Sequence, residues 1–191
     1  MREDAKYGTD KATYFKLFNY LCEKDTDCMM EIRPMNITDA EAIAGIYSYY
    51  TEHTVITFDT EKYDRTAMQK KLAPIVEKYP AFVCLEGDNI VGYCYAHEWK
   101  EKPAYRHTAE VTIYLHPAHT RQGYGTHLMQ HLIKACRAQG LHNLIACITW
   151  PNENSTAFHE KMGFRQVSHF KGVGFKFGRR LDVADYELTL Q

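Results

Sequence analysis

The segment from residue 108 to residue 148 constrains the fold more than any other part of the chain. Thr108–Leu115, TAEVTIYL, alternates between apolar and polar side chains, as a half-buried strand does. The apolar stripe after it predicts a helix from Gly125 to Gln139 that stops at Gly140. The apolar run LHNLIACI then predicts a central strand. A strand, a helix and a strand in this order require a crossover that packs the helix against a sheet.

The remaining patterns place further helices and strands around this unit. We expect a strand from Glu31, a helix after a capping box at Thr38–Glu41, a second helix bent by Pro74, a hairpin made of AFVCLE and IVGYCYAHEW, a short helix from Asn154 to Met162, and closing strands near Phe164–Phe170 and Val183–Leu190. The predicted order is β-α-α-β-β-β-α-β-α-β-β. This order is typical of an α/β protein with one mixed sheet flanked by helices.

The length of 191 residues fits one domain. Residues 1–29 lack the regular pattern of the rest, apart from one possible amphipathic helix over Ala12–Leu21. We therefore predict an N-terminal extension of unknown role at 1–29 and a catalytic or binding domain at 30–191.

Composition excludes several classes of function. The formal net charge of −1 gives no electrostatic reason to expect a nucleic acid or an anionic membrane as partner. The six cysteines form no CxxC pair and the ten histidines form no HExxH motif, so we expect no metal site. No run reaches the ~20 apolar residues of a membrane span, and the N-terminus lacks a secretory signal. These features predict a cytoplasmic protein with reduced thiols.

The loop between the strand at 108–115 and the following helix is the most informative motif. Gly123 and Gly125 flank the predicted start of the helix, where glycine lets the backbone approach a ligand closely. Free amides and the helix dipole at that point form a cradle for phosphate oxygens, to which Arg121 can add a charge. An ordinary glycine-containing turn explains the same segment equally well. The chain has no GxxxxGK[ST] sequence, which excludes a P-loop, and its GxG comes too late for a dinucleotide fingerprint.

Two segments together resemble a known family. HTRQGYGTHLM and NENSTAFHEKMGF are similar to the acetyl-CoA-binding motifs of the GNAT superfamily of N-acetyltransferases. ITFDTE, PAYRHTAEVTIYL, ACITWPNENS and GFKFGRRLDV resemble the branch that contains phosphinothricin and methionine sulfone or sulfoximine acetyltransferases. The resemblance covers about residues 30 to 190, a whole domain by size. Thr120 departs from the superfamily, which usually has Gln or Arg there, and His159 stands where many members have a tyrosine.

The resemblance implies that 30–191 is an N-acetyltransferase domain with a GNAT-like fold and a mixed, mostly antiparallel sheet. It also implies acetyl-CoA as the acetyl donor, without a metal. It implies a small amine as acceptor and a homodimer. The residues that it places on acetyl-CoA are Ile113, Tyr114, Leu115, Arg121, Gln122, Gly123, Tyr124, Gly125, Thr126, Asn154 and Ser155. Asn154 has a second interpretation as a helix cap.

Glu110 is the predicted catalytic base and His159 the predicted proton donor to the leaving thiolate. Amide formation needs a neutral amine, and a carboxylate whose pKa is raised by burial can take the proton near neutral pH. Periodicity alone favours a solvated strand residue for Glu110, and only the resemblance favours the catalytic role. An ordinary surface or core histidine is the alternative for His159.

Pocket candidates for the acceptor are Phe58, Trp99, Lys100, Tyr105 and Arg106. Lys100 or Arg106 can hold a carboxylate or phosphinate, although each also fits a solvated loop charge. A late basic group, Lys171, Lys176, Arg179 and Arg180, fits the CoA phosphates, the acceptor pocket or solvent equally well. Two other functions stay open: an idle acyl-CoA-binding sensor, and an acetyltransferase for protein N-termini or lysines.

Overall fold

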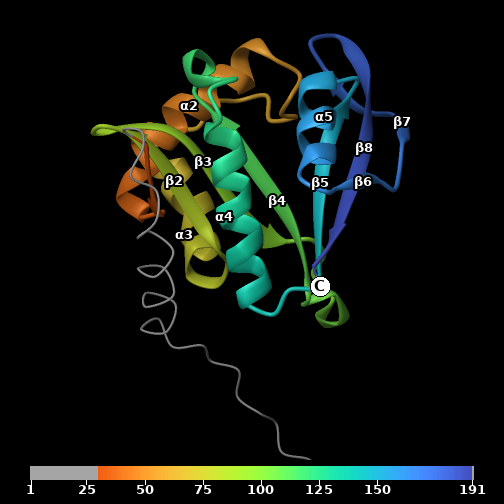
Figure 1. The fold of residues 1–191 in the computed structure, drawn as a ribbon. Coiled ribbons are helices and arrows are strands. Elements are labelled where there is room, and N and C mark those ends of the chain that lie inside the picture. The colour runs from red at the N-terminus through yellow and green to blue at the C-terminus, as the bar shows by residue number, and fades with distance from the viewer. Residues whose placement is uncertain (1–29, 191) are drawn as a thin grey trace, which may run out of the picture.

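A computed structural model describes residues 30–190 of the chain (Figure 1). The proposed extension at 1–29, with its predicted helix at Ala12–Leu21, lies outside the described residues. The elements in chain order are β1 (Met30–Pro34), α2 (Ala40–His53), α3 (Arg65–Lys78), β2 (Ala81–Glu86), β3 (Asn89–Glu98), β4 (Thr108–Leu115), α4 (Tyr124–Ala138), β5 (Asn143–Trp150), α5 (Glu153–Lys161), β6 (Arg165–Gln166), β7 (Phe170–Lys176) and β8 (Arg179–Thr189).

The eight strands form one sheet in the order β1-β2-β3-β4-β5-β8-β6, with β7 paired to β8. β4 and β5 run parallel, and the other pairs are antiparallel. Helix α4 makes the connection between the two parallel strands, as the pattern of residues 108–148 predicts. The α/β class and the mixed, mostly antiparallel sheet are therefore confirmed.

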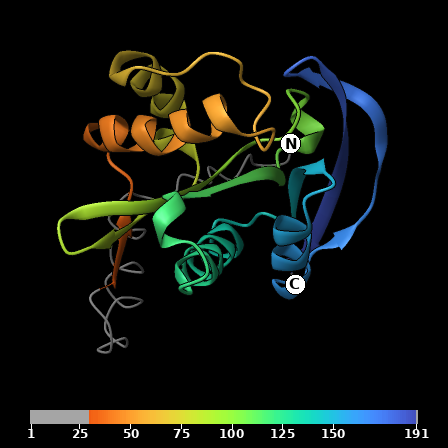
Figure 2. The same ribbon diagram turned by 90° about the horizontal axis from the view of Figure 1, so that it is seen from above.

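Helices cover both faces of this sheet (Figure 2). Helices α2 and α3 pack on one face with Tyr93 and Tyr95, whereas α4 packs on the other with Ala109 and Val111. The alternation in β4 follows from this arrangement, because Tyr114 contacts the α2 side while its neighbours contact α4. Each face of the central strands thus has its own apolar core.

Two predicted helix caps are wrong. The capping box before α2 uses Asn36 and Asp39 in place of Thr38 and Glu41, because a 3₁₀ turn at Ile37–Asp39 precedes the helix. Asp39 also binds the guanidinium of Arg33 through two hydrogen bonds of 2.8 Å.

At α5 the cap is Asn152, whose Oδ1 accepts the Ser155 amide at 3.2 Å. Asn154, the predicted cap, lies inside the first turn. The cap lies two residues earlier than the sequence pattern indicates, and the first residue of the helix is Glu153.

The end of the chain carries one strand more than predicted. Residues 165–190 form β6, β7 and β8, of which β6 has two residues. Gly172 and Gly174 interrupt the apolar alternation of β7, which hides it from pattern analysis. Val173, Phe175 and Phe177 are 63%, 67% and 59% exposed, so this edge carries an unusual set of solvent-facing apolar side chains.

We expect two glycine substitutions to change stability in opposite directions. A Cβ at Gly92 would lie 2.4 Å from Leu115 Cδ2 and 3.2 Å from the Tyr114 carbonyl oxygen, so Gly92→Ala overpacks the core. It should lower the free energy of unfolding by about 1–3 kcal/mol. A Cβ at Gly45, inside α2, meets no heavy atom within 4 Å, so Gly45→Ala should raise it by roughly 0.5–1 kcal/mol. Urea unfolding measures both, and a Gly92→Ala protein as stable as the wild type would contradict this packing.

Candidate active site

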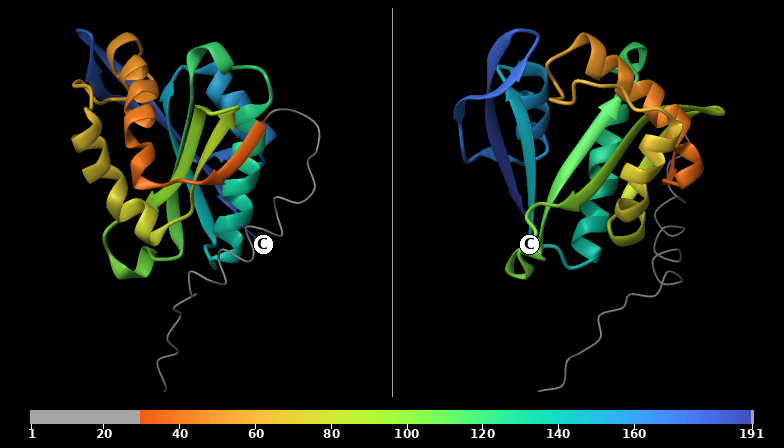
Figure 3. Two further views of the ribbon diagram at one scale, coloured as in Figure 1. Left: turned by 90° about the vertical axis from the view of Figure 1, so that its left-hand side faces the viewer. Right: turned by 180° about the vertical axis from the view of Figure 1, so that it is seen from behind.

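An opening between β4 and β5 creates the site. The two strands are paired only where Thr108–Glu110 faces Asn143–Ile145, and beyond these residues they separate. Figure 1 and the right-hand view of Figure 3 show the strands meeting at one end and diverging toward the other. Their facing backbone edges are consequently free of sheet pairing along Val111–Leu115, where they can bind a ligand.

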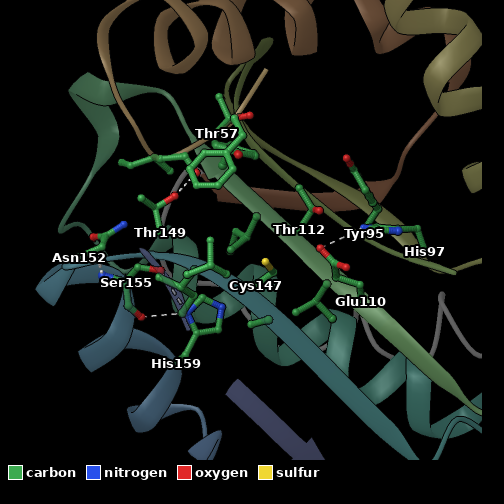
Figure 4. Close-up of a pocket in the computed structure, with 18 of the residues that line it drawn as sticks. Thr57, Tyr95, His97, Glu110, Thr112, Cys147, Thr149, Asn152, Ser155 and His159 are labelled. Atoms are coloured by element: carbon green, nitrogen blue, oxygen red, sulfur yellow. Dashed lines mark hydrogen bonds and ion pairs between the residues drawn. The ribbon is translucent and has the colours of Figure 1, made fainter. Parts of the chain in front are cut away.

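A cavity of about 330 Å³ occupies this opening. Strand β4 contributes Glu110–Tyr114, and β5 contributes Ala146–Thr149. Figure 4 shows Glu110, Tyr95 and His97 together at one end, with Asn152, Ser155 and His159 near the other. The remaining lining residues are Tyr47, Ile56, Thr57, Phe58, Lys71 and Val183. The volume fits a small molecule.

Glu110 is a carboxylate held in a largely desolvated position. Its side chain is 30% exposed, and its Oε1 lies 3.8 Å from His97 Nε2. Burial, with a smaller contribution from the charge of Asp185, raises the pKa of Glu110 to about 7. A carboxyl group with such a pKa is divided between its acid and its base form at neutral pH, which suits proton transfer.

His159 is 5% exposed and lies on α5 against the cavity. Its Nδ1 is 2.8 Å from the carbonyl oxygen of Ser155, and since a carbonyl only accepts, Nδ1 must carry the hydrogen. Burial lowers the pKa of His159, which favours the neutral ring. In that ring Nε2 is an acceptor without a proton to give. The arrangement therefore weighs against the predicted role of proton donor.

The glycine loop lies at the wide end of the opening, where α4 begins. Gly123 is the residue before the helix and has a φ of +92°, and Arg121 has a φ of +63°. The start of a helix presents backbone N–H groups and the positive end of the helix dipole, and this turn places both beside the opening. These residues fit a diphosphate, since the cradle consists of backbone donors and Arg121 is exposed nearby. Gln122, Gly125 and Thr126 belong to the same loop and first turn.

Contacts behind the loop hold it in place. The Tyr124 hydroxyl donates to Glu86 Oε1 at 2.5 Å, and His119 Nε2 lies 3.1 Å from Glu86 Oε2. Glu86 stands at the end of β2, so the hairpin supports the start of α4. Gln122 Nε2 donates to the Ala118 carbonyl at 3.2 Å.

The other residues predicted to bind acetyl-CoA divide into two sets. Ile113, Tyr114 and Ser155 line the cavity. The carbonyl oxygen of Leu115 accepts the Tyr50 hydroxyl at 2.7 Å, and Asn154 is exposed on α5 while Asn152 lines the cavity. Asn152 is a lining residue that the sequence pattern did not single out.

Of the predicted acceptor residues, only Phe58 lines the cavity. Trp99, Lys100, Tyr105 and Arg106 lie in the loop between β3 and β4, outside the described lining. There the Lys100 ammonium sits 4.0 Å from the centre of the Trp99 ring. The sequence offered these four residues as pocket candidates, and the single chain does not bring them to this cavity.

The segment that carries Phe58 is clamped against the last strands. Lys176 is 3% exposed, and its Nζ donates to the Thr57 carbonyl at 2.8 Å. A Cβ at Gly174 would lie 2.2 Å from the Phe58 ring, so glycine is needed for this approach. Thr149 Oγ1 also donates to the Val55 carbonyl at 2.8 Å. Of the late basic group, Lys176 thus supports the pocket wall from behind, while Lys171, Arg179 and Arg180 are exposed.

Several lining residues escaped the sequence analysis. Thr57, Lys71, Tyr95, His97, Cys147 and Thr149 line the cavity and were not among the predicted site residues. His97 could have been predicted from the sequence. The hairpin and the next strand predict that β3 pairs with β4, and in this ladder His97 lies opposite Glu110. Lys71 reaches the cavity from α3, and no local pattern reports that contact.

Two kinds of feature are absent from the described part of the chain. Within residues 30–190, no three His, Cys, Asp or Glu side chains gather in a way that could hold a metal ion. None of the helices there is long and apolar enough to cross a membrane.

A sheet that opens between two parallel strands, with a glycine loop at the helix start beside the opening, fits an acyl-CoA-dependent transferase. Residues 32–184 match the model of the acetyltransferase (GNAT) domain, and the chain belongs to that family. The enzyme class predicted from the sequence, an N-acetyltransferase with acetyl-CoA as donor, is confirmed.

Individual relatives are named as amino-acid-modifying enzymes. The phosphinothricin N-acetyltransferase of Streptomyces coelicolor is 35% identical, over 84% of this chain and 96% of its own. The L-methionine sulfoximine/L-methionine sulfone acetyltransferase of Salmonella typhimurium is 33% identical, over 84% and 95%. The crystal structure of a phosphinothricin acetyltransferase from Sinorhizobium meliloti in complex with AcCoA superposes with a TM-score of 0.81 at 31% identity, covering 85% of this chain and 89% of that one.

Proposed function

We propose that this protein transfers an acetyl group from acetyl-CoA to the amino group of a small, amino-acid-like acceptor, such as phosphinothricin, methionine sulfone or sulfoximine. The observation that carries the proposal is the desolvated carboxylate of Glu110 inside a small cavity, at the point where β4 and β5 separate. The names of the relatives support the choice of acceptor.

In this proposal each part of the cavity has one task. The Glu110 carboxylate takes a proton from the acceptor's ammonium group, directly or through a water. The neutral nitrogen then attacks the thioester carbonyl, and the N–C bond forms. The C–S bond breaks to release the CoA thiolate, and the proton that the nitrogen loses as it becomes an amide protonates this thiolate. Amides of the free β4 edge near Ile113 stabilise the negative charge on the carbonyl oxygen during the attack. Amides at the start of α4, with Arg121, bind the diphosphate.

Release of CoA thiol tests the proposal. The purified full chain is mixed with acetyl-CoA and a panel that contains free L-amino acids, methionine sulfone, phosphinothricin and short peptides. We expect thiol release with one or more free amino acids and none with peptides. Turnover with peptides alone would favour a protein-modifying acetyltransferase, and acetyl-CoA binding without any turnover would favour a sensor.

We further propose that the protein is a cytoplasmic homodimer. The resemblance to a typically dimeric branch supports the dimer, and so does the exposed apolar face formed by Val173, Phe175 and Phe177. The free thiols of Cys84, Cys94, Cys136 and Cys147 and the need for acetyl-CoA support the cytoplasm. Light scattering of the purified protein should give twice the 22.2 kDa mass of the chain, and the mass of one chain would contradict the dimer.

A further inference from the structure

Lys71 gives the cavity a positive charge. Among the described residues that line the cavity it is the only lysine or arginine. It extends from α3, and its Nζ lies 3.1 Å from Asp59 Oδ2. The same ammonium group sits 4.8 Å and 4.6 Å from the ring centres of Tyr47 and Tyr63, and the side chain is 29% exposed. These contacts hold a flexible lysine in one place.

Asp59 compensates the charge of Lys71 only in part. Asp59 Oδ2 also accepts the Tyr47 hydroxyl at 2.7 Å, so this oxygen serves two donors. An ammonium group has three N–H donors, and one of them is used here. Burial works to lower the pKa of Lys71, but Tyr95 and Asp59 outweigh it and raise the pKa, so the lysine is charged at neutral pH.

Lys71 lies at the Glu110 end of the cavity. Tyr95 and His97 stand beside Glu110 (Figure 4), and both interact electrostatically with Lys71. Lys71, Tyr95 and His97 also line a second cavity, of about 310 Å³, next to the first. The diphosphate cradle is on the far side, where α4 begins. The lysine therefore lies at the end of the cavity where the proposed function puts the acceptor, apart from the part of the site that suits CoA.

We propose that Lys71 binds an oxyanion of the acceptor while Glu110 receives the acceptor's amino group. This inference rests on the proposed function. It replaces Lys100 and Arg106, which lie outside the described lining, as the anchor for the acid group. The oxyanion is either the α-carboxylate or an acidic group on the acceptor's side chain. The same charge-assisted hydrogen bond from Nζ serves both.

The test compares acceptors that differ in their oxyanions. Steady-state kinetics are measured for wild type, Lys71→Met and Lys71→Arg with methionine sulfone, its α-carboxamide and phosphinothricin. Losing a charge-assisted hydrogen bond should lower kcat/KM of Lys71→Met on the order of 10- to 100-fold, mainly through KM. Lys71→Arg should recover part of the loss. A loss for methionine sulfone but not for its carboxamide assigns the α-carboxylate, and a loss for phosphinothricin alone assigns the side-chain group.

Asp59→Asn is the matched control, since it removes the partner and leaves the lysine. Freed from its counter-ion, Lys71 should bind oxyanion acceptors more tightly, so their KM should fall. If Lys71→Met fails to fold, this opposite shift still tests the role. An equal loss on all three acceptors, no loss at all, or a higher KM for oxyanion acceptors in Asp59→Asn would overturn the inference. A wild type that binds acetyl-CoA but acetylates none of the acceptors would instead refute the proposed function.

Discussion

Replacing Glu110 with glutamine should lower kcat/KM for the amine acceptor by between about a hundredfold and ten-thousandfold, the usual contribution of a general base. Glutamine keeps the size and polarity of the side chain but cannot take the proton. Acetyl-CoA should bind the variant as tightly as the wild type, because Glu110 lies at the opposite end of the site from the start of α4. Steady-state kinetics and acetyl-CoA titration measure the two quantities separately.

The pH profile gives the same prediction a second readout. Because the pKa of Glu110 is about 7, kcat/KM of the wild type should rise tenfold per pH unit below 7 and bend near 7. Above the bend the wild-type profile should level off, because the reacting forms are then the Glu110 carboxylate and the acceptor's ammonium group. Glu110→Gln depends on free amine from solution, so its kcat/KM should rise through pH 7 without a bend. A bend that persists in the variant would assign the titration to another group.

The thermal stability of Glu110→Gln shows whether its loss of activity comes from the missing base or from unfolding. The folded state raises the pKa of Glu110 above its ordinary value of 4.5. The stability that this proton provides is therefore complete below pH 4.5 and is lost as the pH rises through 7. Glutamine has no such loss, so the variant should unfold at the same temperature as the wild type or higher at pH 8.5. A lower melting temperature there would make the loss of activity a folding effect.

Replacing Gly123 with alanine should weaken acetyl-CoA binding about tenfold to a hundredfold. At φ +92° an L side chain strains the turn that aims the amides of α4, while its Cβ meets only His127, at 3.9 Å. The substitution therefore acts through backbone conformation and leaves neighbouring side chains in place. Isothermal titration with acetyl-CoA measures the change.

Gly140→Ala is the control at the other end of the same helix. Gly140 has a φ of +83°, and a Cβ there meets no heavy atom within 4 Å. Both variants should lose roughly 1–2 kcal/mol of stability from the left-handed backbone. Only Gly123→Ala should lose affinity for acetyl-CoA. Equal affinities of the two variants would contradict a diphosphate site at the start of α4.

The sequence predicts most of the fold because each main element has its own local pattern of apolar residues. The alternation in β4 and the stripe of α4 come from burial on opposite faces of one sheet, and both survive in the structure. Strand β7 was not predicted, because Gly172 and Gly174 interrupt the alternation of its apolar residues. One of these glycines makes room for Phe58, more than a hundred positions earlier in the chain. Such a contact leaves no periodic trace in the sequence.

The site residues also divide into those that a local sequence motif predicts and those that only tertiary packing brings to the cavity. Glu110 and the loop around Gly123 belong to continuous motifs, so a resemblance identifies them. Lys71 and Thr57 reach the cavity through tertiary packing of α3 and of the segment after α2, and single-sequence patterns do not report such packing. The hydrogen bond from His159 Nδ1 to the Ser155 carbonyl is likewise a property of the folded helix. The identity of residue 159 as histidine suggested a proton donor, whereas the geometry favours a neutral ring whose Nε2 accepts a hydrogen bond.

Transfer of an isotope-labelled acetyl group tests the central claim most directly. Wild type and Glu110→Gln are each incubated with acetyl-CoA labelled with ¹³C in the acetyl group and with methionine sulfone or phosphinothricin, and the products are read by NMR and mass spectrometry. We expect a labelled amide on the acceptor's α-nitrogen with the wild type and a much slower appearance of it with the variant. Labelled acetyl-CoA that stays intact in the presence of every amino acid tried would contradict the claim.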